Sequence, residues 1–311
     1  MSYPKVTVVG AGHVGATAAQ LLLLHELADV ALIDVVDGLP QGKALDLMHA
    51  RSVERFGPRI IGTNDYADTA GSDLVIITAG LARKPGMSRD DLLEANSQIV
   101  RSVVEQAVAA SPDAVLLCVT NPLDVMVYLA RKVSGLPASR VLGMGGVLDS
   151  ARFAYAIAEE TGAPVETIEA VTVGAHGDAM VPLPRHSTVA GTRLTALLSA
   201  DRVSALVSRT VNGGAEVVAL LKTGSAYYAP ASSVVRMARA ILTDAGDTLP
   251  SCVLLDGEYG IDDVYLSVPA TLGREGVRAV PELPLTADEL AALRGSAATV
   301  AEALDGLGLR A

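Results

Sequence analysis

A histidine and two charged residues near the middle of the sequence have types and spacings suited to acid–base chemistry. His176 lies between glycines in the stretch 173–178, VGAHGD, directly after an apolar run. Histidine exchanges a proton near neutral pH, and a carboxylate partner fixes its tautomer and stabilises the imidazolium. The glycines let backbone and ligand approach closely. This stretch is a candidate proton-transfer site, with a purely structural histidine as the alternative, and the sequence leaves the partner carboxylate open.

The two charged residues are Asp149 and Arg152, three positions apart in the stretch 148–153, LDSARF. A helical conformation places them on one face, where an intrahelical ion pair adds only a few tenths of a kcal/mol. Whether they serve a ligand or only each other is open at this point. Asn121 follows the apolar run 114–119, at the carboxyl edge where open α/β sheets bind ligands. Its amide can bind a ligand or complete a turn.

Two further arginines, Arg83 and Arg89, lie in the stretch 80–90, GLARKPGMSRD, which follows the apolar run 74–77. The glycines and the proline of this stretch indicate a loop. Because the formal net charge of the chain is -11, a site for an anionic ligand has to be locally basic. The loop is therefore a candidate anion-binding segment, and a solvated basic surface is the alternative.

A glycine-rich motif near the start of the chain predicts a nucleotide site. The stretch 10–15, GAGHVG, follows a predicted strand at 5–9 and opens a predicted helix at 14–26, which is the context that a dinucleotide-binding loop requires. Its glycines allow a tight turn, close approach to a pyrophosphate and helix–strand packing. The helix start attracts the phosphates. The predicted cofactor-binding residues of this loop are Gly10, Ala11, Gly12, His13, Val14 and Gly15.

Asp34 ends the second predicted strand, about 20 residues beyond the glycine motif. A carboxylate there accepts hydrogen bonds from the adenosine ribose hydroxyls and repels the 2′-phosphate of NADP, so NAD is the predicted cofactor. The alternative is an ordinary glycine turn with an aspartate at a strand end. His13 is interpreted as a residue of the helix start rather than as a chemical group.

The first part of the chain alternates short β-branched runs with helical patterns, which is typical of β-α-β units and a Rossmann-type doubly wound parallel sheet. A second, α+β domain is expected where this alternation ends. The predicted domains are therefore 1–145, which binds NAD, and 146–311, which holds the substrate and catalytic residues. The predicted strands are 5–9, 30–34, 59–62, 74–78, 114–119 and 141–143, and the predicted helices between them are 14–26, 42–51, 88–110 and 123–134.

The second domain is predicted to contain helices at 148–161, 201–222 and 232–243, with strands near 170–173, 252–255 and 263–268 and a turn-rich stretch around 182–191. The last helix shows one apolar stripe with alternating spacings of three and four residues, which indicates core or subunit contact. The stripe consists of Leu290, Leu293, Ala297, Val300 and Leu304.

Composition excludes several classes of protein. The chain has 311 residues, of which 50% are hydrophobic, yet no apolar run reaches the roughly 18 residues of a membrane span. No export signal is visible, so a cytoplasmic protein is expected. A net charge of -11 opposes binding to nucleic acid or anionic membranes. Cys118 lies in an apolar run and is expected to be an ordinary buried thiol, and neither a disulfide nor a metal site is expected from Cys118 and Cys252.

In combination these motifs resemble the malate and lactate dehydrogenase family along nearly the whole chain. The resemblance rests on the stretches 10–15, GAGHVG; 120–122, TNP; 148–153, LDSARF; and 174–178, GAHGD, in this order and spacing. Within the family, the stretch 40–46, PQGKALD, and above all Arg83 are similar to the lactate-dehydrogenase-like branch of the malate dehydrogenases. The chain departs from the common pattern at Ala154, at Ala175 and in the adenine-side loop around His13, and none of these departures removes a catalytic group.

The resemblance implies a reversible, NAD-dependent oxidation of L-malate to oxaloacetate. It implies that His176 takes the hydroxyl proton and that Asp149 holds the resulting imidazolium. Arg152 would bind the C1 carboxylate through two parallel hydrogen bonds, and Arg89 would polarise the C2 oxygen. Arg83 would pair with the second carboxylate, where lactate enzymes carry a neutral glutamine.

The resemblance also implies roles for residues around the reacting centre. Asn121 would orient the reacting oxygen, Ser225 would line the substrate pocket, and Asn96, Val119 and Thr120 would line the nicotinamide side. The family further implies a homodimer or homotetramer. One alternative is an L-lactate or other 2-hydroxyacid dehydrogenase, and Arg83 argues against it. The other is a catalytically silent dinucleotide-binding sensor. The joint presence of four residues argues against the sensor: His176, Asp149, Arg89 and Arg152.

Overall fold

The computed structural model describes residues 3–81 and 89–310, with residues 89 and 90 described by their backbone only. The chain forms two compact units. The first comprises Met1–Met144, Tyr227–Asp247 and Thr271–Arg278, and the second comprises Gly145–Ala226, Thr248–Ala270 and Ala279–Ala311. The predicted division between residues 145 and 146 assigns Tyr227–Asp247 and Thr271–Arg278 to the second domain. In the structure these two segments belong to the first unit.

The first unit contains a parallel sheet with the strand order β3-β2-β1-β4-β5-β6. This order confirms the predicted Rossmann-type, doubly wound sheet, since strands are added outward in both directions from β1. The elements of this unit are β1 (Lys5–Val9), α1 (His13–Leu24), β2 (Asp29–Ile33), α2 (Leu39–Glu54), β3 (Ile60–Thr63), η1 (Tyr66–Thr69), β4 (Leu74–Ile77), α3 (Arg89–Ala110), β5 (Val115–Cys118), α4 (Leu123–Ser134), η2 (Ala138–Arg140), β6 (Val141–Gly143) and α8 (Tyr228–Leu242).

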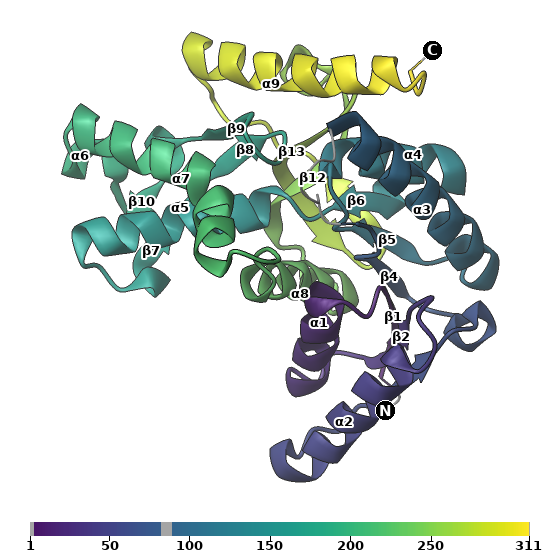
Figure 1. Cartoon of the computed structure of the whole chain (residues 1–311). Coiled ribbons are helices and arrows are strands. Elements are labelled where there is room, and N and C mark those ends of the chain that lie inside the picture. Colours follow the sequence, from purple (N-terminus) through teal and green to yellow (C-terminus); the bar gives the residue numbers. More distant parts are fainter. Residues whose placement is uncertain (1–2, 82–88, 311) are drawn as a thin grey trace. The chain divides into compact units, whose positions relative to one another are not determined.

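Helices cover both faces of this sheet, which explains why its strands are nearly continuous apolar runs. All four residues of β4 and all four of β5 are buried. Helices α1 and α8 pack side by side, and α3 and α4 form a second pair on the other face (Figure 1). The packing of α8 against α1 is what draws the segment Tyr227–Asp247 into the first unit.

Two helices of this unit begin earlier than the sequence predicts. The predicted helix 42–51 extends over Leu39–Glu54 and carries Pro40 in its first turn. The predicted helix 232–243 begins at Tyr228 and carries Pro230 in its first turn. The first turn of a helix leaves its N–H groups without intrahelical partners, so proline costs little there.

The second unit combines helices with antiparallel strands. Strands β12, β13, β8 and β9 are neighbours in that order, and β11, β10 and β7 form a small separate sheet. The elements are α5 (Gly146–Thr161), η3 (Val165–Thr167), β7 (Ile168–Glu169), β8 (Thr172–Gly174), β9 (Met180–Pro182), η4 (Pro184–His186), β10 (Thr188–Val189), β11 (Thr192–Arg193), α6 (Leu194–Leu197), α7 (Ala200–Leu221), β12 (Thr248–Asp256), η5 (Glu258–Gly260), β13 (Asp262–Gly273) and α9 (Ala287–Gly306). The end of β13 and nearly all of β14 (Gly276–Ala279) belong to the segment Thr271–Arg278 of the first unit.

Two helical faces form much of the interior of the second unit. Phe153 and Ile157 of α5 pack with Leu206 of α7 in one apolar cluster. The predicted stripe of the last helix is also internal: α9 packs on β8 and β9, and four stripe residues are buried, with Leu290 half-buried. The buried four are Leu293, Ala297, Val300 and Leu304. Of the two interpretations of the stripe, the structure therefore supports core.

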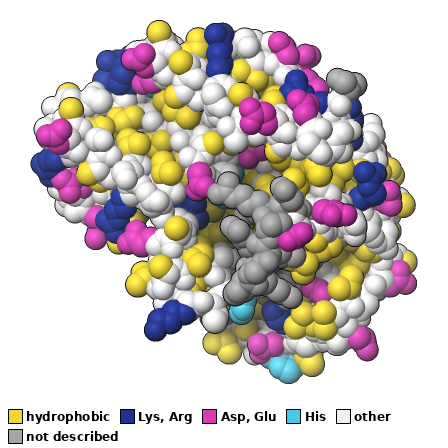
Figure 2. Space-filling model, turned by 45° about the horizontal axis from the view of Figure 1, so that its top comes forward, with side chains coloured by type: hydrophobic (Ala, Val, Ile, Leu, Met, Phe, Trp, Pro, Cys, Tyr) yellow, Lys and Arg dark blue, Asp and Glu magenta, His cyan; other side chains and the backbone are white. Residues whose placement is uncertain are grey.

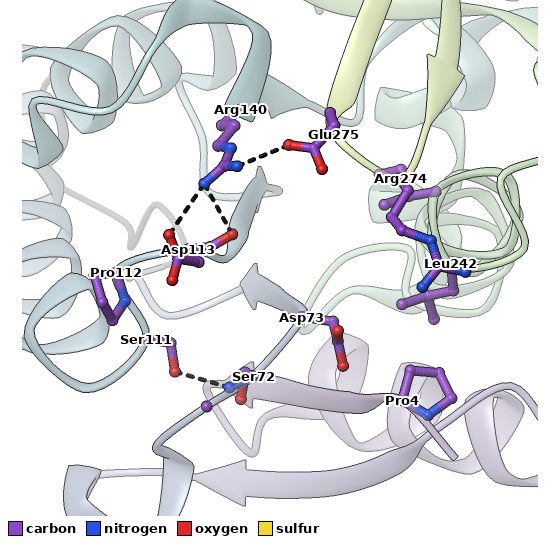
Figure 3. Close-up of a pocket in the computed structure, with 12 residues that line it drawn as sticks. Pro4, Ser72, Asp73, Ser111, Pro112, Asp113, Arg140, Leu242, Arg274 and Glu275 are labelled. Carbon is purple, nitrogen blue, oxygen red and sulfur yellow. Dashed lines mark hydrogen bonds and ion pairs between the residues drawn. The ribbon is translucent and has the colours of Figure 1, made fainter. Parts of the chain in front are cut away.

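Charged residues gather at the amino ends of the strands in the first unit, away from the edge at which ligands are expected. Figure 3 shows Arg140, just before β6, which donates from Nη2 to Glu275 Oε2 at 2.7 Å. Its Nη1 donates to the Asp113 carbonyl oxygen at 3.2 Å. The hydrogen bond to Glu275 raises the pKa of Arg140. Arg140, Asp113 and Glu275 line a pocket of about 330 Å³. None of the predicted site residues lines this pocket, and we interpret it as structural.

The surface in Figure 2 carries basic side chains singly or in small groups among acidic ones. An extended basic surface of the kind that binds nucleic acid is not visible on this face. Among the described residues, no helix is both long and apolar enough to cross a membrane.

Candidate functional site

The backbone of the glycine-rich loop explains two of its glycines by packing alone. Gly10 has a φ of 101°, and a Cβ there would lie 2.7 Å from Thr78 Oγ1. A Cβ on Gly15 would lie 1.8 Å from the Gly10 carbonyl oxygen, so the first turn of α1 could not pack on the loop. Among the residues that the structure describes, none lies within 4 Å of the Cβ position of Gly12. Packing therefore leaves Gly12 unexplained, and close approach of a ligand to its backbone is the remaining reason for a glycine there.

The peptide groups of Ala11 are held at both ends by charged side chains. Ala11 N–H donates to Asp34 Oδ2 at 2.7 Å, and Lys43 Nζ donates to the Ala11 carbonyl oxygen at 2.6 Å. Asp34 Oδ1 accepts a further hydrogen bond from Val36 N–H at 3.0 Å. Lys43 is a residue that sequence reasoning missed as a site residue. The only available signal was its place in the stretch 40–46, which served as a family marker.

A cleft of about 670 Å³ opens beside this loop in the first unit. Its lining combines apolar side chains, the Asp34 carboxylate and the backbone of Gly10 and Gly12. These groups fit NAD: apolar walls suit an adenine ring, the carboxylate suits ribose hydroxyls, and the loop with the start of α1 suits the pyrophosphate. Burial raises the pKa of Tyr66 to about 12, so this wall stays neutral. The apolar walls are Val9, Ile33, Val35, Val36, Tyr66, Leu81, Ile99 and Val103.

Polar side chains tie together the carboxyl ends of β4 and β5. Asn96 is 1% exposed; its Oδ1 accepts from Leu81 N–H at 2.7 Å, and its Nδ2 donates to the Asn121 carbonyl oxygen at 2.7 Å. Thr120 Oγ1 donates to the Ala79 carbonyl oxygen at 2.6 Å. The Asn121–Pro122 peptide bond is cis. Asn96 and Thr120 thus shape this edge by binding backbone, while the Asn121 side chain is exposed.

The second unit brings together two predicted catalytic residues, His176 and Asp149, and the predicted substrate-binding residue Arg152. His176 Nδ1 lies 2.9 Å from Asp149 Oδ2, and Arg152 Nη1 donates to Asp149 Oδ1 at 3.2 Å. Asp149 is 1% exposed and lies in the first turn of α5, where the helix dipole favours a negative charge. One buried carboxylate is therefore shared by a proton-exchanging side chain and an anion-binding side chain.

Serine hydroxyls fix the elements that carry this group. Ser150 Oγ on α5 accepts a hydrogen bond from Thr172 N–H on β8 at 2.9 Å, which joins the helix of Asp149 to the strand before His176. Ser296 Oγ on α9 accepts from Ala175 N–H at 2.8 Å. Both serines are buried. Sequence reasoning missed them, because their partners lie far away along the chain.

Two further predicted site residues are exposed, and the side chains of two others lie outside the described residues. Ser225 is exposed between α7 and α8. His13 is exposed and stacks on Tyr227 with ring centroids 4.9 Å apart, a contact that the sequence did not predict. Arg83 lies outside the described residues, as does the side chain of Arg89, whose backbone begins α3.

Cys118 is a buried thiol, as expected, and Cys252 is buried as well. Burial raises the pKa of Cys118 to about 12, so this thiol stays protonated and unreactive at pH 8. We expect an aromatic disulfide reagent to titrate no thiol in the native protein at pH 8 and both after denaturation. A Ser52→Cys variant, exposed on α2, is the positive control. Rapid native reaction of the unsubstituted protein would contradict the burial.

No group of metal-ligating residues occurs among the described residues.

Comparison with known families matches both parts of the chain. Residues 4–143 match the NAD binding domain of lactate/malate dehydrogenases, and residues 146–307 match the alpha/beta C-terminal domain of the same family. The malate dehydrogenase of Roseiflexus castenholzii is 52% identical over 301 residues, which cover 97% of each chain.

Solved structures of both enzyme types are similar to this chain. The malate dehydrogenase of Salinibacter ruber has a TM-score of 0.94 and 48% identity, covering 98% of this chain and 97% of its own. The lactate dehydrogenase of Cryptosporidium parvum, solved with lactic acid and NAD, has a TM-score of 0.94 and 40% identity, covering 98% of this chain and 99% of its own. Fold similarity alone therefore does not separate the two substrates.

Proposed function

Because the chain belongs to the lactate/malate dehydrogenase family, we propose that it interconverts L-malate and oxaloacetate with NAD as its cofactor. The observation that carries the proposal is the Asp149 carboxylate that joins His176 and Arg152. This arrangement supplies the two requirements of a 2-hydroxyacid oxidation, which are a group that exchanges the hydroxyl proton and a group that binds the adjacent carboxylate. Identity of 52% to a malate dehydrogenase supports the dicarboxylate.

His176 acts as the acid–base group. With Nδ1 directed at Asp149, Nε2 takes the C2 hydroxyl proton of malate, and Asp149 stabilises the imidazolium. NAD, when bound, accepts the hydride that leaves C2. In the reverse direction protonated His176 returns the proton to the carbonyl oxygen of oxaloacetate. Malate oxidation therefore requires neutral His176, and oxaloacetate reduction requires the protonated form.

Arginines bind the substrate in this proposal. Arg152 binds the C1 carboxylate, and its guanidinium suits two parallel hydrogen bonds. Arg89 polarises the C2 oxygen, Arg83 pairs with the second carboxylate, and Asn121 orients the reacting oxygen. Ser225 contributes to the fit of the substrate. The roles of Arg83 and Arg89 rest on the family motif.

The cofactor is held by the first unit. The loop from Gly10 to Gly15 and the start of α1 bind the pyrophosphate, and Asp34 binds the adenosine ribose. Asn96 and Thr120 position backbone at the nicotinamide side, and the family motif places Val119 beside them. Since a carboxylate repels a 2′-phosphate, NAD is preferred over NADP.

Lactate dehydrogenase activity is the second candidate, and the similar lactate dehydrogenase structure is the observation that favours it. Arg83 opposes it, since a guanidinium that faces the methyl group of lactate lacks a partner. A silent dinucleotide-binding sensor is the candidate from another class. A sensor that only binds a dinucleotide does not require the Asp149 carboxylate to be shared by His176 and Arg152.

A steady-state assay separates these candidates. We expect kcat/KM to be highest with oxaloacetate and NADH, and to fall by at least about tenfold when pyruvate replaces oxaloacetate or NADPH replaces NADH. Equal or better turnover of pyruvate would favour the lactate enzyme. Binding of NADH without turnover of either oxoacid would favour the sensor.

We propose a cytoplasmic homodimer or homotetramer, which follows the family resemblance. Large apolar side chains that remain exposed in the single chain support subunit contact; they include Val53, Val165, Leu220, Leu221 and Tyr228. Light scattering after size exclusion measures the subunit number, and a mass of one chain at micromolar concentration would contradict the oligomer.

A further inference from the structure

Two adjacent glycines interrupt the middle of α7, a helix of 22 residues. Gly213 and Gly214 lie well inside the helix, where glycine is less favourable than any residue except proline. They also lie on the less exposed face of the helix, in register with Val203, Leu206 and Thr210. A core helix normally carries apolar side chains along that whole face, so two consecutive glycines there need a packing reason.

The packing reason is Arg152. A Cβ on Gly213 would lie 3.3 Å from Arg152 Cδ and 3.7 Å from its Cγ. A Cβ on Gly214 would lie 3.5 Å from Arg152 Nη2 and 3.7 Å from its Cζ. Gly213 therefore faces the aliphatic stem of the arginine, and Gly214 faces its guanidinium.

The surrounding contacts fix this alignment of α7 with α5. Leu206 of α7 packs with Phe153 and Ile157 of α5, and the Arg209 guanidinium lies 5.6 Å from the centre of the Tyr155 ring. Later residues of α7 thus face earlier residues of α5, which is the order of two antiparallel helices. The apolar contacts hold α5 and α7 in place. A side chain added at Gly213 would therefore displace the Arg152 side chain rather than move the two helices apart.

We propose that Gly213 is a positioning residue for Arg152: because Gly213 has no side chain, the stem of Arg152 has the space in which it is seated for the substrate carboxylate. Gly214 lies beside the guanidinium but leaves it more room. The proposal rests on the proposed function, in which Arg152 binds the C1 carboxylate. Arg152 is 19% exposed and is also bonded to Asp149, so it is held on two sides. Asp149 determines the direction of Nη1, and α7 determines how far the side chain lies from its own helix.

The two positions differ in the available space, and this difference makes the test specific. The distance of 3.3 Å at Gly213 is tight for a carbon–carbon contact, whereas 3.5 Å at Gly214 is ordinary contact. Gly213→Ala should raise KM for oxaloacetate by about 3- to 10-fold, and Gly213→Val by about 30-fold or more, because small misplacements of a binding group weaken substrate alignment. Gly214→Ala should change it by less than about twofold.

A mid-helix glycine without neighbours provides the control. None of the described residues lies within 4 Å of the Cβ position of Gly295 in α9. Gly295→Ala should therefore raise the melting temperature and leave KM for oxaloacetate and KM for NADH unchanged. The dissociation constant of NADH, measured by the fluorescence of NADH, should stay unchanged in every variant. A general loss of fold would instead lower the melting temperature and weaken both ligands.

A double-mutant cycle decides whether Gly213 acts through Arg152. If it does, Gly213→Ala should change kcat/KM for oxaloacetate by less than about twofold in an Arg152→Ala background, since the Cγ and Cδ atoms that it displaces are then gone. An unchanged KM in the folded Gly213→Ala and Gly213→Val proteins, or an equal effect in both backgrounds, would overturn the inference. If Gly213→Val does not fold, Gly213→Ala against Gly214→Ala decides alone. Loss of Arg152 without effect on turnover would instead overturn the proposed function.

Discussion

Replacement of His176 by asparagine should lower kcat by about 10²- to 10⁴-fold in both directions, which is the range of a general acid–base group. Asparagine retains a donor that can reach Asp149, so the ion pair between Asp149 and Arg152 is preserved. Substrate and cofactor should therefore still bind. Stopped-flow and steady-state measurement of NADH oxidation and NAD reduction, with the dissociation constant of NADH, would separate chemistry from binding.

The matched control for this substitution is His25→Asn, because His25 is exposed at the end of α1 and has no proposed role. It should keep the unsubstituted kcat. Near-normal turnover of His176→Asn in both directions would contradict the acid–base assignment. Normal turnover in one direction only would also contradict it, since the same nitrogen takes the proton in one direction and returns it in the other.

Replacement of Arg83 by glutamine should lower kcat/KM for oxaloacetate through a loss of about 2 to 5 kcal/mol of transition-state stabilisation. This is the cost of removing one partner of a desolvated charge pair. The loss corresponds to roughly 30-fold to several thousand-fold. Turnover of pyruvate should not fall in parallel, because a neutral side chain suits a methyl group better than a guanidinium does. The informative quantity is therefore the ratio of kcat/KM for oxaloacetate to that for pyruvate.

Arg193→Gln is the control for Arg83, since Arg193 is exposed on β11 and has no proposed role. It removes the same charge from the protein and so tests whether net charge alone changes the attraction of a dianion. An unchanged preference in Arg83→Gln would remove Arg83 from substrate selection. The roles of His176 and Asp149 would not be affected by that result.

The parallel sheet was predictable because its strands are buried on both faces and hence appear as short apolar runs. The strand predicted at 5–9 is Lys5–Val9, and the one predicted at 141–143 is Val141–Gly143. Strands of two or three residues, such as Thr188–Val189, are too short to show an alternating pattern. The return of Tyr227–Asp247 to the first unit was not predictable either, because no local pattern encodes a contact across two hundred residues.

The candidate site was predictable to the extent that local spacing determines it. Asp149 and Arg152 are three residues apart in one helix, so their common face follows from helix geometry. The approach of His176 to Asp149 spans 27 residues and was implied by family resemblance only. Lys43 contacts the Ala11 carbonyl oxygen across 32 residues. Such contacts depend on tertiary packing, and the chemical type of the residue does not reveal them.

The late return of α8 has a consequence for synthesis. The face of α1 that packs on α8 stays uncovered until the ribosome has passed residue 242, and the first unit is complete only after residue 278. The second unit is interrupted twice by these segments, so neither unit is a contiguous piece of chain. A fragment cut at residue 145 would carry the nucleotide loop without the helix that supports it. The nucleotide-binding unit is thus encoded early and finished late.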